Sequence, residues 1–391
     1  MKKFILAKIY LVIVVIIYSS NILAQSYNIG HISTDFYDNA RNRNITTEIY
    51  YPSDTNGDNV SISLGNFPII VFGHGFLMSW DSYDNFWNSL VPEGYILCFP
   101  TTEMGFAPNH QFFAEDLSFI ASKMQMESLN NSSIFYNSVL PKTGILGHSM
   151  GGGASFLAAE NNPNINTLIN FAAAETNPSA IFAASNITIP SLIFSGDDDC
   201  VAPPINHQNI MFDSLNSNCK TQINIINGGH CYFANENVLC SFGESSCNSN
   251  LNILRAEQQS VTNDFLKIWL NFSLKSDQNS FTIFNDSLQS SSRITYSQYC
   301  NSTGFMDQNK LDEINVYPNP VTEILNIDVP LEFIDGELIL YNIFGQELHK
   351  KIISNKLTEI NLSNFESGSY FIFIKKEGVV KKYKIIKVVN Y

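Results

Sequence analysis

Short runs of apolar residues recur along the first three quarters of the chain, separated by stretches with helix-like spacing. These runs predict strands at 67–72, 143–147, 167–174 and 189–196, and residues 221–226, of alternating character, predict another. Runs that are apolar on both faces are typical of a parallel sheet covered by helices on both sides. Helical spacing at 261–272 predicts the last packing helix. The pattern predicts an α/β fold with a doubly wound, mostly parallel sheet over residues 25–303.

Beyond residue 313 the pattern changes to short strands in which apolar and polar residues alternate. They lie at 324–329, 337–342, 369–374 and 384–388, with turn glycines between them. Such strands predict a small all-β sandwich, and about 78 residues suffice for an independent domain. Polar residues crowd 273–312, so we expect the fold to loosen over this stretch toward a domain boundary. We place the linker at 304–312 and the second domain at 313–391.

The first 24 residues have the pattern of a secretory signal peptide. Met1-Lys2-Lys3 gives a positive start, an apolar run follows at 9–17, and Ala24 is a small residue suited to cleavage. The apolar run is shorter than the roughly 20 residues that cross a bilayer. We therefore expect cleavage after Ala24 and no stable membrane span.

Charge is distributed unevenly along the chain. Residues 25–312 carry ten Lys and Arg against 26 Asp and Glu, whereas residues 313–391 carry nine against ten. A region this acidic repels phosphate backbones and anionic lipids. Nucleic acid is therefore not expected as a partner, and a neutral substrate is.

The stretch Gly147-His148-Ser149-Met150-Gly151 has the form G-x-S-x-G and lies between a predicted strand and a helix opening on small residues. That setting predicts a nucleophile elbow, a sharp turn that lifts a serine hydroxyl above the sheet. Ser149 is thus the candidate nucleophile.

A serine nucleophile needs a base and a group that orients the base, in the chain order Ser, Asp or Glu, His. Three aspartates, Asp197 to Asp199, follow the strand at 189–196 and leave the choice of acid open. We prefer Asp199, because Val201-Ala202-Pro203 is expected to turn the chain back and aim this side chain inward. His230 follows the next strand on a glycine-rich loop and is the candidate base.

Acyl transfer also requires N–H donors for the oxyanion. One is the backbone N–H after the nucleophile, here Met150. The other comes from the loop after an earlier strand, which predicts Phe76 in Gly73-His74-Gly75-Phe76. His74 is expected to brace this loop by hydrogen bonding.

Together these motifs resemble the α/β-hydrolase superfamily over about residues 40–272. The branch they resemble comprises cutinase-like, dienelactone-hydrolase-like and platelet-activating-factor-acetylhydrolase-like serine esterases, and it includes bacterial polyester hydrolases. The resemblance implies Ser149 as nucleophile, Asp199 as orienting acid, His230 as base, and Phe76 and Met150 as oxyanion donors.

One departure from that branch concerns the substrate. Polyester hydrolases of this kind carry an aromatic residue, usually Trp, on the loop after the strand that follows the elbow helix. Here the corresponding loop, 175–180, has no aromatic residue. The resemblance therefore does not extend to this aromatic residue, which is one half of the pair of rings that grips an aromatic polyester unit.

The tail also resembles a known family, the C-terminal sorting domain of type IX secretion in Bacteroidota. The matching segments are Tyr317-Pro318-Asn319-Pro320, 341–346, 362–371 and the lysine-flanked last strand. The resemblance implies export across the outer membrane, release or attachment at the cell surface, and removal of the tail. The alternative is a carbohydrate-binding or adhesive module.

Seven cysteines in an exported chain indicate an oxidising compartment. Cys200 follows Asp199 and Cys231 follows His230, so a triad would bring these two sulfurs close together. We expect a Cys200–Cys231 disulfide, a short loop closed by Cys240 and Cys247, and at least one unpaired cysteine. No spacing has the form of a metal site, so neither a metal nor a cofactor is expected.

These predictions combine into a secreted hydrolase of carboxylic esters, whether short-chain, lipid or polymeric, that acts through an acyl-serine intermediate. Because one triad serves several acyl transfers, a peptidase and a thioesterase remain alternatives. The alternative of another class is a catalytically silent hydrolase fold that binds at the surface.

Overall fold

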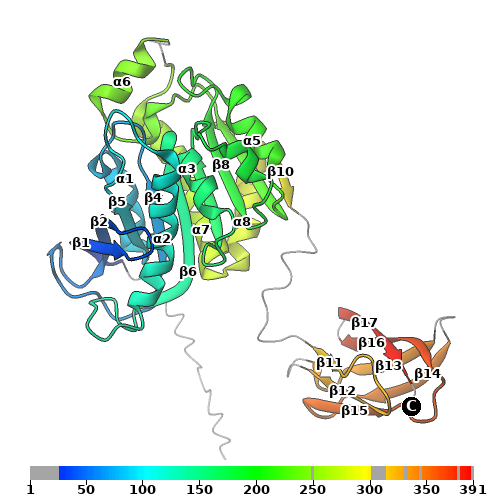
Figure 1. Ribbon diagram of the computed structural model, residues 1–391. Coiled ribbons are helices and arrows are strands. Elements are labelled where there is room, and N and C mark those ends of the chain that lie inside the picture. Colours follow the sequence, from blue (N-terminus) through cyan, green and yellow to red (C-terminus); the bar gives the residue numbers. More distant parts are fainter. Residues whose placement is uncertain are drawn as a thin grey trace, which may run out of the picture. The chain divides into compact units, whose positions relative to one another are not determined.

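The computed structural model describes residues 26–247, 251–300, 314–329, 333–342, 346–376 and 379–388. The predicted signal peptide at 1–24 and linker at 304–312 lie outside these residues. The chain divides into two compact units, residues 1–301 and 302–391. Figure 1 shows both units, which are described separately below.

The first unit contains one sheet of ten strands in the order β10-β9-β8-β7-β6-β4-β5-β2-β1-β3. Five neighbouring pairs, from β5-β4 to β8-β9, are parallel, whereas β2, β1 and β10 add antiparallel pairs at the two sides. The strands are β1 (Asn28–Asp38), β2 (Arg43–Ser53), β3 (Gly57–Asp58), β4 (Phe67–Gly73), β5 (Ile96–Pro100), β6 (Val139–His148), β7 (Thr167–Phe171), β8 (Ser191–Gly196), β9 (Cys219–Ile225) and β10 (Ile294–Cys300).

Helices cover both faces of this sheet (Figure 1). Each of the helices α2, α3 and α4 packs against the next helix along the chain, and α1 and α8 each pack against α7. The helices are α1 (Asp84–Leu90), α2 (His110–Glu127), α3 (Met150–Ala159), α4 (Ala180–Ala184), α5 (Gln208–Ser214), α6 (Val238–Ser245), α7 (Arg255–Lys275) and α8 (Gln278–Ser290). Short 3₁₀ helices occur at η1 (Trp80–Tyr83), η2 (Val91–Glu93), η3 (Pro204–Asn206) and η4 (Cys231–Phe233).

The central strands are buried along their whole length, which explains their unbroken apolar sequence. Every residue of β4, β5, β7 and β8 is buried. Edge strand β10 shows the opposite pattern, because only Ile294 is buried and the next five residues are exposed. The predicted α/β class with a mostly parallel sheet is therefore confirmed.

The prediction for residues 273–300 was wrong. The helix expected at 261–272 extends over Arg255–Lys275, and α8 and β10 follow in the stretch that was expected to loosen toward a boundary. The polar residues of α8 line its outer side, while Phe284 and Leu288 are buried and Phe284 packs against Phe265 and Trp269. A narrow apolar stripe was thus hidden among polar residues.

The second unit consists of two antiparallel sheets, β11-β12-β15 and β14-β13-β16-β17. Side chains of both sheets, among them Leu325, Leu340 and Ile372, form one hydrophobic core. The strands are β11 (Asn315–Tyr317), β12 (Ile324–Asp328), β13 (Glu337–Asn342), β14 (Glu347–Ile352), β15 (Leu357–Asn361), β16 (Gly368–Lys376) and β17 (Val379–Lys387). The predicted small β domain has this architecture, with β11, β14 and β15 in addition to the four strands expected.

Candidate active site

Ser149 lies at the turn between β6 and α3 with a backbone conformation that few non-glycine residues adopt. Its φ is 54° and its ψ is −119°, a strained geometry of the kind that clusters at functional sites. Two glycines permit this turn. A Cβ at Gly147 would lie 2.2 Å from the Gly151 oxygen, and a Cβ at Gly151 would lie 2.2 Å from the Gly73 oxygen. No other residue type fits without moving backbone.

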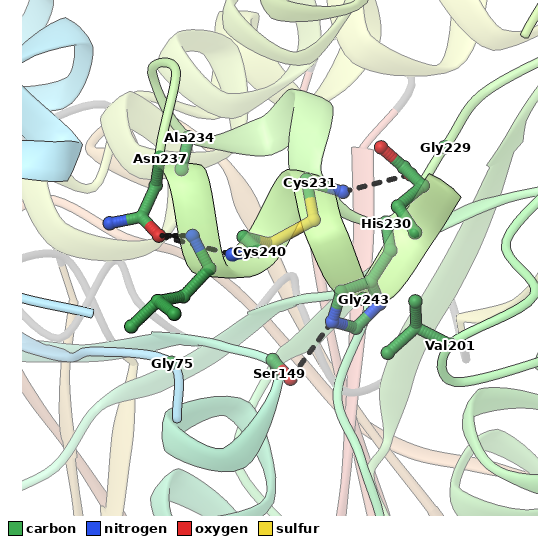
Figure 2. Close-up of a disulfide and its surroundings, with 12 residues drawn as sticks. Gly75, Ser149, Val201, Gly229, His230, Cys231, Ala234, Asn237, Cys240 and Gly243 are labelled. Carbon is green, nitrogen blue, oxygen red and sulfur yellow. Dashed lines mark hydrogen bonds between the residues drawn. A yellow bond between two sulfur atoms is a disulfide. The ribbon is translucent and has the colours of Figure 1, made fainter. Parts of the chain in front are cut away.

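The structure brings Ser149, His230 and Asp199 together in one hydrogen-bonded line. The His230 Nε2 atom lies 2.9 Å from the Ser149 hydroxyl oxygen, and His230 Nδ1 lies 2.8 Å from Asp199 Oδ2. Figure 2 shows the imidazole of His230 pointing at the Ser149 hydroxyl. The three residues follow β6, β8 and β9, whose carboxyl ends meet at the same edge of the sheet.

Among the three aspartates, only Asp199 is turned into the protein. It is 3% exposed, and its Oδ1 accepts the backbone N–H groups of Val201 and Ala202 at 2.9 and 2.8 Å. Burial acts to raise the pKa of Asp199, but the His230 ring and these two N–H groups hold the pKa below its ordinary value. Asp197 is exposed and Asp198 is half-buried. The local turn at Val201–Ala202 therefore orients the acid.

The two predicted oxyanion residues follow neighbouring strands. Met150 is the first residue of α3, where backbone N–H groups have no partner within the helix. Phe76 follows β4, the strand beside β6, and its side chain is 46% exposed. His74 is buried, with its ring nitrogens 2.9 and 2.8 Å from the carbonyl oxygens of Gly75 and Thr102, so it joins this loop to the one after β5.

Three side chains that the sequence did not suggest hold the backbone on either side of His230. Gln258 of α7 exchanges two hydrogen bonds of 2.9 Å with the Gly229 N–H and C=O. The Glu244 carboxylate of α6 accepts the Cys231 N–H at 3.1 Å, and Arg255 donates to the carbonyls of Cys231 and Ala234. The candidate base is therefore fixed by its flanking peptide groups as well as by Asp199.

The predicted Cys200–Cys231 disulfide is wrong, and so is the short loop between Cys240 and Cys247. The structure contains disulfides Cys200–Cys247, Cys231–Cys240 and Cys219–Cys300. The His230 ring points toward Ser149, whereas the Cys231 sulfur is bonded to Cys240 of α6 (Figure 2). Both loops are therefore bonded to α6 and its end rather than to each other.

The disulfides predict a simple chemical result. Among the described residues Cys98 is the free cysteine, and it is buried in β5. We expect native protein to react with no alkylating reagent, and denatured unreduced protein to be modified once, at Cys98. Peptide mapping without reduction checks this, and a free Cys200 or Cys231 would contradict the pairing.

Two histidines hold the loop after β7, which is the loop that lacks the aromatic residue of related polyester hydrolases. The ring Nδ1 atoms of His207 and His110 accept the backbone N–H groups of Glu175 and Asn177 at 3.0 and 3.1 Å. Burial lowers the pKa of both rings, which favours the neutral form that these bonds require. The next aromatic residue is Phe182 of α4, which is 71% exposed.

His148, the variable residue of the G-x-S-x-G motif, is completely buried, and burial lowers its pKa to about 3. An unfolded histidine has a pKa of about 6.5. Below pH 6.5 the unfolded chain binds a proton at this histidine, whereas the folded protein binds it only near pH 3. The free energy of unfolding therefore decreases as the pH falls from about 6.5 to about 3. The expected slope is about 1.4 kcal/mol per pH unit.

Denaturant unfolding between pH 7 and pH 4 measures this slope. In His148→Gln the free energy of unfolding is expected to fall less steeply with decreasing pH, because unfolding of this variant takes up one proton fewer. Equal slopes for the variant and the natural protein would show that His148 titrates normally in the fold.

Among the residues that the structure describes, no group of three or more His, Cys, Asp or Glu side chains is arranged to hold a metal ion. Within the same residues, no helix has both the length and the apolar character needed to cross a membrane.

The ten-stranded sheet with an elbow serine at its carboxyl edge defines the first unit as an α/β hydrolase. Comparison with known protein families supports this assignment. The model of the family described as PET hydrolase-like matches residues 41–245, which is more than half of the chain. The chain therefore belongs to the PET hydrolase-like family, whose members are carboxylic-ester hydrolases.

A second family model, described as the secretion system C-terminal sorting domain, matches residues 315–388. This match covers the second unit and indicates secretion to the cell surface or the medium by the type IX machinery. The prediction of a sorting domain is confirmed.

Proposed function

We propose that the protein is a secreted serine esterase in which Ser149, His230 and Asp199 form the catalytic triad and the substrate is a neutral ester, polyester included. The observation that carries this proposal is the continuous line from the Ser149 hydroxyl through His230 to the buried Asp199 carboxylate, with steps of 2.9 and 2.8 Å.

In the first half of the reaction, Ser149 Oγ attacks the ester carbonyl carbon while His230 Nε2 takes the hydroxyl proton. Asp199 stabilises the imidazolium that forms. The backbone N–H groups of Phe76 and Met150 donate to the oxyanion, and loss of one such donor typically costs about 10²–10³ in rate. The tetrahedral intermediate collapses, and the alcohol leaves with the proton from His230.

In the second half, water attacks the acyl-Ser149 carbonyl and gives its proton to His230. Collapse of the second intermediate releases the carboxylic acid and returns the proton to Ser149 Oγ. No electron is transferred and no metal is required in this sequence.

Two features of the surrounding surface support a neutral and partly apolar substrate. Side chains of Phe76 and Val201 are 46% and 42% exposed, and the Val201 backbone N–H donates to Asp199, the residue that contacts His230. The acidic balance of residues 25–312 disfavours anionic partners such as nucleic acid. With residues 25–303 as catalytic domain and 313–391 as sorting domain, the machinery that binds the tail is the expected protein partner.

Matched substrates test the reaction class. We expect p-nitrophenyl esters and a polyester film to be hydrolysed by the mature enzyme, and the amide and thioester of the same acyl group to react far more slowly. Faster cleavage of the amide or thioester would replace the esterase proposal by a peptidase or thioesterase. No hydrolysis at all would indicate a silent fold.

A further inference from the structure

We propose that Tyr83 and His148 are positioning residues, forming a buried hydrogen-bond relay that holds the oxyanion loop and the His230 loop in fixed relation to Ser149. This inference rests on the proposed triad mechanism and adds two residues to it. Neither side chain is part of the triad, and His148 has no exposed surface.

The relay consists of three hydrogen bonds in sequence. The Gly75 N–H lies 2.8 Å from the Tyr83 hydroxyl oxygen, that oxygen lies 3.0 Å from His148 Nδ1, and His148 Nε2 lies 3.0 Å from the His230 carbonyl oxygen. These bonds join four segments of the chain: the loop after β4, the nearby η1, the elbow and the loop after β9.

The direction of every bond in the relay follows from the chemistry of its ends. A carbonyl oxygen only accepts, so His148 Nε2 carries the proton and donates to His230. His148 Nδ1 must then accept, which makes the Tyr83 O–H its donor and leaves the Tyr83 oxygen to accept from Gly75. Burial raises the pKa of Tyr83, so its hydroxyl keeps its proton, and burial lowers the pKa of His148, so Nδ1 stays unprotonated and can accept.

The relay is closely packed, and the Tyr83 hydroxyl also lies 3.3 Å from Met78 Sδ. A Cβ at Gly75 would lie 2.9 Å from Met78 Sδ, 3.1 Å from His148 Nδ1 and 3.1 Å from the Tyr83 oxygen. The Tyr83 ring packs against Phe72 and Phe86, and His148 packs against the rings of His230 and Phe233. Removal of the Tyr83 hydroxyl would leave two buried polar groups, the Gly75 N–H and His148 Nδ1, without these hydrogen bonds.

Each end of the relay is one peptide away from a reacting group. Gly75 precedes Phe76, whose N–H is the proposed oxyanion donor, and the carbonyl that His148 binds belongs to His230 itself. Misplacement of catalytic groups by about 1 Å can cost about 10²-fold in rate. The relay is therefore expected to affect kcat rather than the binding of the ground-state ester.

Tyr83→Phe removes the hydroxyl and keeps the ring, and Tyr95→Phe is a matched control. Tyr95 is equally buried, and its hydroxyl donates to Asn271 Oδ1 at 2.9 Å. It precedes β5, at the opposite end of the parallel strands from Ser149. With a p-nitrophenyl ester, we expect Tyr83→Phe to lower kcat about 10- to 10²-fold with KM changed less than about twofold. Tyr95→Phe is expected to lower only Tm.

A second variant keeps the inference testable if Tyr83→Phe folds poorly. His148→Leu removes the donor to the His230 carbonyl, and it too is expected to lower kcat with KM little changed. The double variant with Tyr83→Phe is expected to show little further loss of kcat. An equal kcat in Tyr83→Phe and Tyr95→Phe, with both folded, would overturn the relay. Failure of the natural protein to cleave esters would instead overturn the proposed function.

Discussion

Ser149→Ala and His230→Ala are each expected to lower kcat for ester hydrolysis by about 10⁴–10⁶, and the double variant by little more than either alone. The reason is that the hydroxyl is a weak nucleophile unless His230 Nε2, 2.9 Å away, removes its proton. Removal of either group therefore disables the same step. Steady-state kinetics of the three variants measure this directly.

The matched control for this double-mutant cycle is His31→Ala. His31 lies on β1 and contacts the carboxylates of Glu48 and Asp58 rather than the triad, so kcat is expected to be unchanged. Losses that add up in the Ser149/His230 double variant would show that one of the two residues takes no part in the chemistry.

The second large effect is expected for Asp199→Asn, which should lower kcat by about 10⁴ while the fold is kept. An asparagine can donate to His230 Nδ1 and so favour the wrong tautomer of the ring, and it cannot stabilise the imidazolium. Circular dichroism checks the fold, and kcat for a p-nitrophenyl ester checks the chemistry.

Asp198→Asn is the natural control, because it makes the same chemical change one residue earlier, at a half-buried position. We expect it to change kcat only slightly. A large loss in Asp198→Asn with normal activity in Asp199→Asn would assign the orienting role to the other carboxylate.

The sequence sufficed to predict the elements whose burial is complete or whose geometry is locally encoded. The central strands are apolar throughout because both of their faces are covered. The elbow is encoded by Gly147 and Gly151, which alone leave room for the backbone contacts around Ser149. The loop glycines before His230 likewise marked a histidine that follows a strand. Each of these features depends on residues close together in the chain.

What the sequence did not predict depends on directions and distances that neighbours in the chain do not determine. Cys200 and Cys231 follow two residues that contact each other, but the directions of their own side chains depend on the local turns, and they bond to Cys247 and Cys240 instead. Tyr83 precedes His148 by 65 residues, and no local pattern links the two. Helix α8 was missed because only a few of its residues face the core.

The disulfides also bear on the compartment in which the fold is completed. The backbones that carry Asp199 and His230 are each bonded through the following cysteine to the segment around α6. In a chain with a sorting domain at residues 315–388, these bonds can form after export from the reducing cytoplasm.

Labelling with a fluorophosphonate, followed by peptide mapping, tests most directly whether Ser149 is the activated nucleophile. We predict one adduct per molecule, on the peptide that contains Ser149, with parallel loss of ester hydrolysis and no adduct in Ser149→Ala. Ester hydrolysis that persists in Ser149→Ala, or an adduct on another residue with Ser149 unmodified, would contradict the proposed mechanism.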